Sequence, residues 1–263
     1  MNLKEKIQAG LSICGTFNNI PAMCVTEMMG YFDYDYLWID AEHSVTTTEQ
    51  CYAQIVAAKS VNKASIVRVP QNDLTYTKKV LEMGPDGIIF PMVHSAKEAE
   101  ELLSYTLYPP FGSRGCGPQR AVRYGVDDEI AYFKSGHGNL CRFLQIERKS
   151  FIDELDLIAD NPYIDGFILG LADLSGSINE IGDFFSENNL ALAQKAIAIA
   201  QKHNKIVGAA TVATDEKTLT MLYNMGIKMI TCGADFNYIV NGAKNTYETV
   251  KRVMAGNPKN GDF

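Results

Sequence analysis

The chain has 263 residues, of which 46% are hydrophobic, and a formal net charge of −7 at pH 7. This apolar content can bury a substantial core, which excludes an intrinsically disordered chain. The negative charge disfavours nucleic acid or an anionic membrane surface as the main partner, and the length is typical of an α/β barrel, which needs roughly 250 residues.

Short apolar runs separated by helical segments predict the fold. Most runs are continuous rather than alternating, as in parallel strands covered on both faces. Eight strand and helix units in this length favour a closed (β/α)8 TIM barrel, an α/β fold, over an open sheet. In chain order, the predicted strands are Ser12–Phe17, Tyr36–Asp40, Ser65–Pro70, Gly87–Val93, Leu140–Glu147, Gly166–Gly170, Lys205–Ala210 and Lys228–Cys232. The predicted helices between them include Thr75–Met83, Ala96–Leu103, Ser150–Ala159, Leu190–His203 and Asp215–Met225.

No linker, low-complexity tract or charge block divides the sequence, which predicts a single domain over residues 1–263. Two connections are longer than the others, Tyr105–Gly138 and Leu171–Asn189. The first is too rich in proline and glycine for a long helix. Loops of this length in a compact fold are commonly functional.

The cysteines and the amino terminus indicate the compartment. Six cysteines are scattered with no CxxC pair, which is typical of reduced, structural thiols. The first residues form a charged helical opening without the apolar core of a signal peptide, and no run approaches the ~18 apolar residues of a membrane span. We therefore expect a soluble, cytoplasmic protein without a membrane partner.

Titratable residues follow five of the predicted strands. In a barrel all strands point the same way, so their carboxyl ends meet at one mouth, where active sites lie. A single such ending is usually a strand that reaches water, but a series of them predicts an active site. The residues are Asp40 at the end of the second strand with Glu42 and His43 after it, Arg68 on the third, His94 after the fourth, Glu147 on the fifth and Asp173 after the sixth.

Glu147 and Asp173 belong to adjacent strands, which lie about 4.8 Å apart, so their carboxylates can converge on one divalent cation. Mg²⁺ typically takes one or two carboxylates and fills its other positions with water or substrate oxygens. Two acids therefore indicate an open, catalytic metal site. In the alternative, Glu147 pairs with Arg148 or Arg142, and Asp173 caps a turn.

Arg68 and His43 also have two interpretations each. A planar guanidinium at the mouth can stabilise an enolate or clamp a carboxylate, or it can form a structural salt bridge. An imidazole can shuttle protons, or it can be a rim histidine bonded to a neighbouring carboxylate. We interpret His94 as an ordinary rim residue.

An ordered set of motifs carries a family resemblance. IDAEHS, VRVP, GIIFPMV, YPPFGSRGCGPQRAVRYG, QIE and GFILGLADLS follow one another between about Gly15 and Asp235. In this order and spacing the chain resembles the HpcH/HpaI aldolase family, the metal-dependent class II pyruvate aldolases. The resemblance implies a barrel of the phosphoenolpyruvate/pyruvate type, usually a hexamer that exchanges carboxyl-terminal helices. It further implies aldol cleavage of a 4-hydroxy-2-oxo acid to pyruvate and an aldehyde.

The resemblance also implies roles for individual residues. Glu147 and Asp173 would bind Mg²⁺, Mn²⁺ or Co²⁺, which holds the oxo acid. Arg68 would steady the enolate oxygen, and His43 would relay a proton with a nearby acid. The pyruvate carboxylate would lie on backbone amides around Gly170 and Ala172, with Gln145 on the same floor.

The chain departs from the family pattern at two positions. The acidic partner of the histidine is often aspartate in the family, and the matching residue here is Glu82, which is one methylene longer. Asp40 and Glu42 are the other acids that can partner His43. The proline that usually precedes the ADLS motif is replaced by Leu171.

Two other functions compete with aldol cleavage. A CoA-thioester lyase resembling the citrate lyase β subunit would share the barrel and the metal acids, but usually carries a LEDAV-type motif where this chain has IDAEHS. A non-catalytic barrel would be expected to lack at least one of the four central residues, and all four are present. An imine mechanism would need a desolvated lysine at a strand end, and the predicted strands offer none. Candidates for lining the aldehyde subsite are Phe17, Asn18, Asn19, Tyr124 and Thr211.

Overall fold

The computed structural model describes residues 1–135 and 138–255. Its centre is a closed barrel of eight parallel strands in sequence order, with β8 paired to β1. The predicted TIM barrel is thus confirmed, with small shifts at the strand ends. The strands are β1 Ile13–Asn18, β2 Tyr36–Asp40, β3 Ala64–Arg68, β4 Gly87–Phe90, β5 Cys141–Ile146, β6 Gly166–Leu169, β7 Ile206–Thr211 and β8 Met229–Ala234.

Alternate residues of each strand point into the barrel, because successive side chains in a strand face opposite sides. The inward side chains form one buried cluster that includes Phe17, Trp38 and Phe143. Leu3 and Ile7 of helix α1 (Leu3–Gln8) belong to the same cluster, so α1 closes the amino-terminal end of the barrel. The opposite end, where the strands finish, stays open for polar residues.

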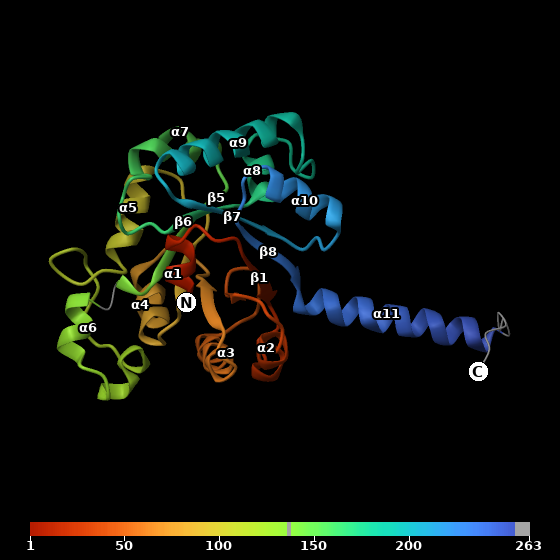
Figure 1. The fold of residues 1–263 in the computed structure, drawn as a ribbon, viewed down its shortest axis with the longest axis horizontal. Helices are drawn as coiled ribbons and strands as arrows, with labels where there is room; N and C mark the ends of the chain where they lie inside the picture. The colour runs from red at the N-terminus through yellow and green to blue at the C-terminus, as the bar shows by residue number, and fades with distance from the viewer. Residues whose placement is uncertain (136–137, 256–263) are drawn as a thin grey trace.

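Helices surround the barrel and bury the outward side chains of the strands in a second apolar cluster (Figure 1). Polar side chains fix several helix starts: Thr47 and Gln50 form a capping box before α3, and Asp73 caps α4. All five predicted helices are present. The helices are α2 Met23–Gly30, α3 Thr48–Ser60, α4 Leu74–Glu82, α5 Ala96–Ser104, α7 Lys149–Ile158, α9 Glu187–Lys202 and α10 Glu216–Asn224.

The two long connections contain short helical pieces. In the first, a 3₁₀ helix, η1 (Arg120–Gly125), is followed by α6 (Glu129–Ser135). The second was expected to be a connection over Leu171–Asn189, but it begins with a helix, α8 (Leu171–Ser177), directly after β6. This helix was not predicted because the glycine and serines of the segment are weak helix formers. As a result Asp173 lies in the first helical turn, where its charge suits the helix dipole.

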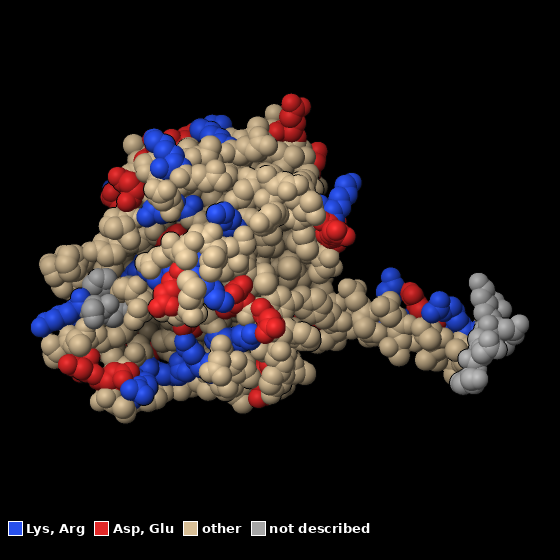
Figure 2. Space-filling model, in the orientation of Figure 1, with Lys and Arg blue, Asp and Glu red and all other residues tan. Residues whose placement is uncertain are grey.

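The carboxyl-terminal helix α11 (Asp235–Met254) projects away from the barrel (Figure 1). Asp235 is its one buried residue. Charged side chains gather along one side of its outer half (Figure 2). None of the helices within the described ranges is long and apolar enough to cross a membrane. The exposed large apolar residues of α11 recur at helical spacing: Phe236, Ile239, Val240, Tyr247, Val250, Val253 and Met254.

Candidate active site

Arg68 and Asp40 form a buried, two-pronged ion pair at the carboxyl ends of β3 and β2. The two residues are register partners, and their side chains are 7% and 1% exposed. Arg68 Nε donates to Asp40 Oδ1 at 2.9 Å, and Nη2 donates to Oδ2 at 2.6 Å. Burial by itself would raise the pKa of Asp40, but the hydrogen bonds and charge of Arg68 more than offset this and lower it. Asp40 is therefore ionised at neutral pH, and its carboxylate holds the Arg68 guanidinium in place.

The rest of the Arg68 guanidinium faces the mouth. Its Nη1 lies 3.0 Å from Glu42 Oε2 and 3.4 Å from Gln145 Oε1. The ring of Trp38 lies beneath it, with 5.3 Å between the guanidinium carbon and the ring centroid, which adds a cation–π contact. Arg68 therefore combines the two predicted interpretations. One edge of its guanidinium forms a salt bridge with Asp40, and the other edge faces Glu42 at the mouth.

Glu147 is buried at the end of β5, with 2% of its surface exposed. Its Oε2 accepts a hydrogen bond from the Met92 amide at 2.6 Å, and Oε1 accepts one from Gln145 Nε2 at 2.8 Å. Burial raises the pKa of Glu147 to about 7, opposed by the Met92 hydrogen bond and reinforced by the charges of Glu42 and Asp173. The charge of Arg68 also opposes this rise in pKa, but Glu147 forms no ion pair of its own within the described ranges, which suits a carboxylate that binds a cation.

The alternative partners proposed for Glu147 lie elsewhere. Arg142 points out of the barrel, where its Nε donates to Thr106 Oγ1 at 2.6 Å and its Nη1 to the Leu140 carbonyl at 3.1 Å. Within the described ranges Glu147 forms no ion pair with Arg142 or Arg148. The salt-bridge alternative for Glu147 is therefore not what the structure shows.

Asp173 stands exposed on the first turn of α8, and its charge raises the pKa of both Glu147 and Glu42. Gly170, between β6 and α8, approaches Glu147 so closely that a Cβ there would lie 2.6 Å from Glu147 Oε1. Glycine therefore permits this close contact, whereas a larger residue would collide with the carboxylate. Within the described ranges no three His, Cys, Asp or Glu side chains form a closed cation site. Two carboxylates at one end of the barrel suit an open site for a hard divalent cation.

His43 lies on the rim beside Glu42. Its Nε2 is 3.7 Å from Glu42 Oε2, its side chain is 64% exposed, and its amide donates to Asp40 Oδ1 at 3.3 Å. Burial is the main cause that raises the pKa of Glu42 to about 7, and the charges of Asp40 and Asp173 add to it, while Arg68 opposes it. Among the described residues, Glu42 is the acid whose carboxylate lies within 4.0 Å of the imidazole.

Glu82 is not beside His43. It is the last residue of α4, where its Oε1 accepts a hydrogen bond from Arg114 Nη2 at 3.1 Å. Burial raises the pKa of Glu82, although Arg114 opposes the shift. Among the described contacts of Glu82, none reaches the mouth, so a single chain does not assemble a Glu82–His43 dyad.

The candidates for lining the aldehyde subsite separate in the structure. Phe17 packs on Trp38 with ring centroids 5.1 Å apart, and Asn19 Nδ2 donates to Asp40 Oδ2 at 3.0 Å, so both belong to the floor around Arg68. Tyr124 instead bonds the Tyr52 hydroxyl at 2.6 Å, on the outer surface. Sequence reasoning missed two contributors, the Met92 amide and the Trp38 ring. Met92 has a φ of 52°, a left-handed conformation that is uncommon for methionine and therefore could not be predicted from the sequence.

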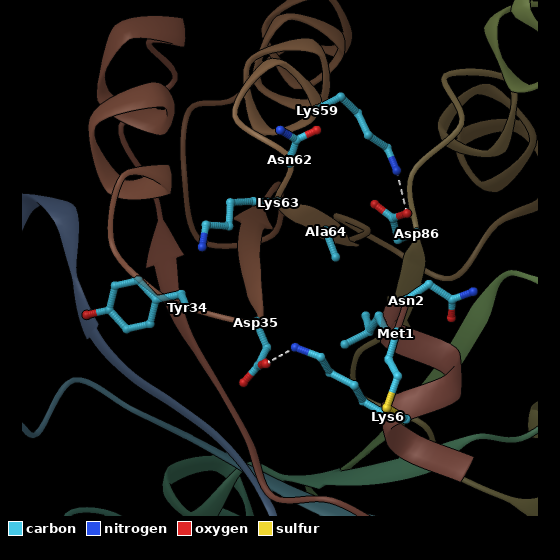
Figure 3. A pocket seen from close by; sticks show the side chains of 11 residues that line it. Met1, Asn2, Lys6, Tyr34, Asp35, Lys59, Asn62, Lys63, Ala64 and Asp86 are labelled. Carbon is cyan, nitrogen blue, oxygen red and sulfur yellow. Dashed lines mark hydrogen bonds and ion pairs between the residues drawn. The ribbon is translucent and has the colours of Figure 1, made fainter. Parts of the chain in front are cut away.

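A cavity of about 330 Å³ lies at the other end of the barrel, between α1, the end of α3 and the starts of the strands (Figure 3). Two of its lysines pair with aspartates of the lining, Lys6 with Asp35 and Lys59 with Asp86, as the dashed lines in Figure 3 mark. The third lysine, Lys63, lies 3.9 Å from the exposed Asp33. None of the predicted site residues lines it.

Comparisons with known proteins identify relatives of the whole chain. The model of the HpcH/HpaI aldolase/citrate lyase family matches residues 15–242. A hydroxypyruvate/pyruvate aldolase of Roseobacter denitrificans is 30% identical over 244 residues, covering 92% of this chain and 94% of the relative. A 2-keto-3-deoxy-L-rhamnonate aldolase of Escherichia coli K12 is 29% identical, covering 88% and 86%. The crystal structure of an HpcH/HpaI aldolase from Desulfitobacterium hafniense, 24% identical, superposes with a TM-score of 0.88 over 100% of both chains.

Proposed function

The chain belongs to the HpcH/HpaI aldolase/citrate lyase family, and we propose that it is a class II aldolase that reversibly cleaves a 4-hydroxy-2-oxo acid to pyruvate and an aldehyde. One observation carries the proposal. The buried guanidinium of Arg68, fixed by Asp40, shares the mouth with the carboxylates of Glu147 and Asp173. A cation and a guanidinium directed at one point match the charge that develops on an enolate oxygen.

Glu147 and Asp173 are the residues that would hold a divalent metal, Mg²⁺, Mn²⁺ or Co²⁺. When bound, the metal supplies Lewis-acid polarisation of the ketone of the oxo acid. Gly170 lets the Glu147 carboxylate lie close against the backbone, and Gln145 orients that carboxylate through its amide. We assign the pyruvate carboxylate to the backbone around Gly170 and Ala172, as the family resemblance implies.

We assign the proton transfers to residues on the rim of the mouth. His43, partnered by Glu42, removes the proton of the C4 hydroxyl. The C3–C4 bond then breaks, its electron pair stays on the pyruvate half as an enolate, and the aldehyde leaves. Arg68 holds the negative enolate oxygen until C3 takes up a proton and pyruvate forms. Glu82, the position that matches the family's acidic partner, keeps a role only if another chain brings it to His43.

Assembly is part of the proposal. The apolar residues of α11 stand exposed at helical spacing on a helix that projects from its own barrel, and burying them requires another surface. We therefore propose a homo-oligomer that exchanges α11 between subunits, a hexamer by family resemblance. We also assign the protein to the cytoplasm, where a reducing environment suits its six free cysteines.

The thioester-lyase alternative receives no specific support from the mouth. His43 lies on the rim 3.7 Å from Glu42, both within IDAEHS, the segment that replaces the LEDAV-type motif. The non-catalytic alternative is disfavoured because His43, Arg68, Glu147 and Asp173 all lie at the one barrel end that hosts active sites.

The test is pyruvate release from short-chain, dicarboxylic and sugar-derived 4-hydroxy-2-oxo acids, with Mg²⁺, Mn²⁺ or Co²⁺ and after EDTA. We expect metal-dependent release that Glu147→Ala reduces by at least about a hundredfold, because the cation loses a ligand. Exchange of the pyruvate methyl protons with D₂O, followed by NMR, reports enolate formation without any aldehyde. A native protein that binds metal but neither releases pyruvate nor exchanges these protons would rule out the proposal.

A further inference from the structure

Asp235, the first residue of α11, is a buried carboxylate whose hydrogen-bond partners are backbone amides. Its side chain is 1% exposed. Oδ2 accepts a hydrogen bond from the Ile20 amide at 2.8 Å, and Oδ1 accepts one from the Phe236 amide at 2.8 Å. No lysine or arginine within the described ranges forms an ion pair with it. A buried charge without a cation is costly, so the geometry that it maintains needs an explanation.

That geometry concerns the turn after β1. The Ile20 peptide is held on both sides, since Asp235 accepts from its N–H and Gln54 Nε2 donates to its carbonyl at 3.2 Å. The preceding residue is Asn19, whose Nδ2 donates to Asp40 Oδ2 at 3.0 Å. The fixed turn therefore fixes the direction from which Asn19 approaches the mouth.

Asp40 is fully engaged by its neighbours. Oδ2 accepts from Arg68 Nη2 and from Asn19, and Oδ1 accepts from Arg68 Nε and from the amides of Glu42 and His43. Each of these bonds restricts rotation of the carboxylate. Without Asn19, Asp40 loses the side-chain donor that reaches it from the turn after β1, and the guanidinium that it holds becomes more mobile.

We propose that Asp235 is a positioning residue of the active site, which acts through the Asn19–Ile20 turn and Asp40 to hold Arg68 in place. The barrel end of α11 is thereby connected to the mouth by a chain of short hydrogen bonds. The catalytic consequence rests on the proposed aldolase function, whereas the hydrogen-bond chain does not. In the competing explanation, Asp235 only stabilises the start of α11 by interacting favourably with the helix dipole, and it has no effect on the active site.

Asp235→Asn and Asn19→Ala, alone and together, distinguish the two explanations. Asparagine has one acceptor oxygen, so it cannot serve both the Ile20 and the Phe236 amides. In the holoenzyme with Mn²⁺, we expect each single variant to lower kcat for pyruvate proton exchange by roughly tenfold, while the affinity for Mn²⁺ is unchanged. The double variant should be no slower than the slower single variant, because both act along one chain.

Trp38 gives a readout that needs no catalysis. It is the only tryptophan of the chain, and Arg68 lies 5.3 Å from its ring centroid. We expect Asp235→Asn and Asn19→Ala to cause the same shift in its emission. The matched control is Asp165→Asn at the other end of the barrel, where the carboxylate also accepts a backbone amide, that of Arg142, at 2.9 Å. This control should leave the emission and kcat unchanged.

The outcomes separate the proposal from the aldolase function. If the native protein exchanges no pyruvate protons, the proposed function fails, and the emission of Trp38 alone decides the hydrogen-bond chain. The positioning role is overturned if folded Asp235→Asn keeps native emission and kcat, or if the two single effects multiply in the double variant. Should Asp235→Asn not fold, Asp235→Ser replaces it, because serine is smaller, stays polar and is too short to reach the Ile20 amide.

Discussion

The two ends of the barrel use the same residue types for opposite purposes. At the amino-terminal end, an aspartate precedes each of β2, β4 and β6. Its carboxylate accepts the backbone amide of the strand before it and pairs with a lysine. The three sets are Asp35 with Cys14 and Lys6, Asp86 with Ser65 and Lys59, and Asp165 with Arg142 and Lys4. Each acid has its own cation.

At the carboxyl-terminal end the balance is broken. Asp40 takes the main share of Arg68, and Glu42 and Glu147 are left with pKa values raised to about 7, with Asp173 nearby. The difference teaches that burial alone does not mark function. An acid paired with its own cation holds neighbouring elements together, whereas buried acids that outnumber their cations mark the end where we propose that a metal binds.

The largest expected effect comes from replacing the guanidinium at the mouth, which tests whether this end of the barrel is the functional one. Arg68→Lys keeps the charge but loses the two-pronged bond to Asp40 and the reach toward Glu42. We expect kcat for pyruvate proton exchange to fall by about 10²–10³, as for the loss of one donor to an enolate oxygen. Lys59→Gln at the opposite end is the control and should exchange at the native rate. An unchanged kcat in Arg68→Lys would remove Arg68 from the mechanism.

The acids of the mouth should also reverse the usual pH dependence of stability in metal-free protein. Glu147 has a folded pKa of about 7 against about 4.5 when unfolded, so between these values the folded state binds more protons. The free energy of unfolding therefore falls as pH rises through this window, by about 1–3 kcal/mol from this residue. Urea unfolding at pH 5 and pH 8 in EDTA measures it.

Metal binding should show the opposite trend with pH. The same proton competes with the cation, so affinity for Mn²⁺ falls by about tenfold for each pH unit below 7. Glu147→Gln is the control for both measurements: it should flatten the stability profile and weaken metal binding at every pH. A stability profile that is identical in native protein and Glu147→Gln would contradict the raised pKa.

Much of the barrel could be predicted from the sequence, and the reason is periodicity. Continuous apolar runs fixed the eight strands, and since all parallel strands end at one mouth, the position of Arg68, Glu147 and Asp173 followed. The family resemblance is confirmed by the match over residues 15–242. What periodicity predicts is which end and which face a residue occupies.

Contacts between loops could not be predicted from periodicity. The bond from Asp235 to the Ile20 amide joins residues 215 positions apart, and the Met92 amide reaches Glu147 through a left-handed turn. Each contact depends on how the closed barrel brings loop ends together, which no local pattern encodes. Glu82 shows the same limit in reverse: its position in the family pattern suggested a partner for His43, whereas its own chain pairs it with Arg114.

The smallest expected effect tests the amino-terminal end. Asp86→Asn keeps one acceptor for the Ser65 amide but removes the charge that pairs with Lys59, and both side chains of this pair are partly exposed. Water screens such a pair, so we expect the free energy of unfolding to fall by only about 0.5–1.5 kcal/mol, with kcat for proton exchange unchanged. Urea unfolding and the NMR exchange assay on one preparation measure both quantities. A loss of kcat without a loss of stability would show that this end of the barrel reaches the chemistry, and the division of the two ends into a stabilising and a functional one would fail.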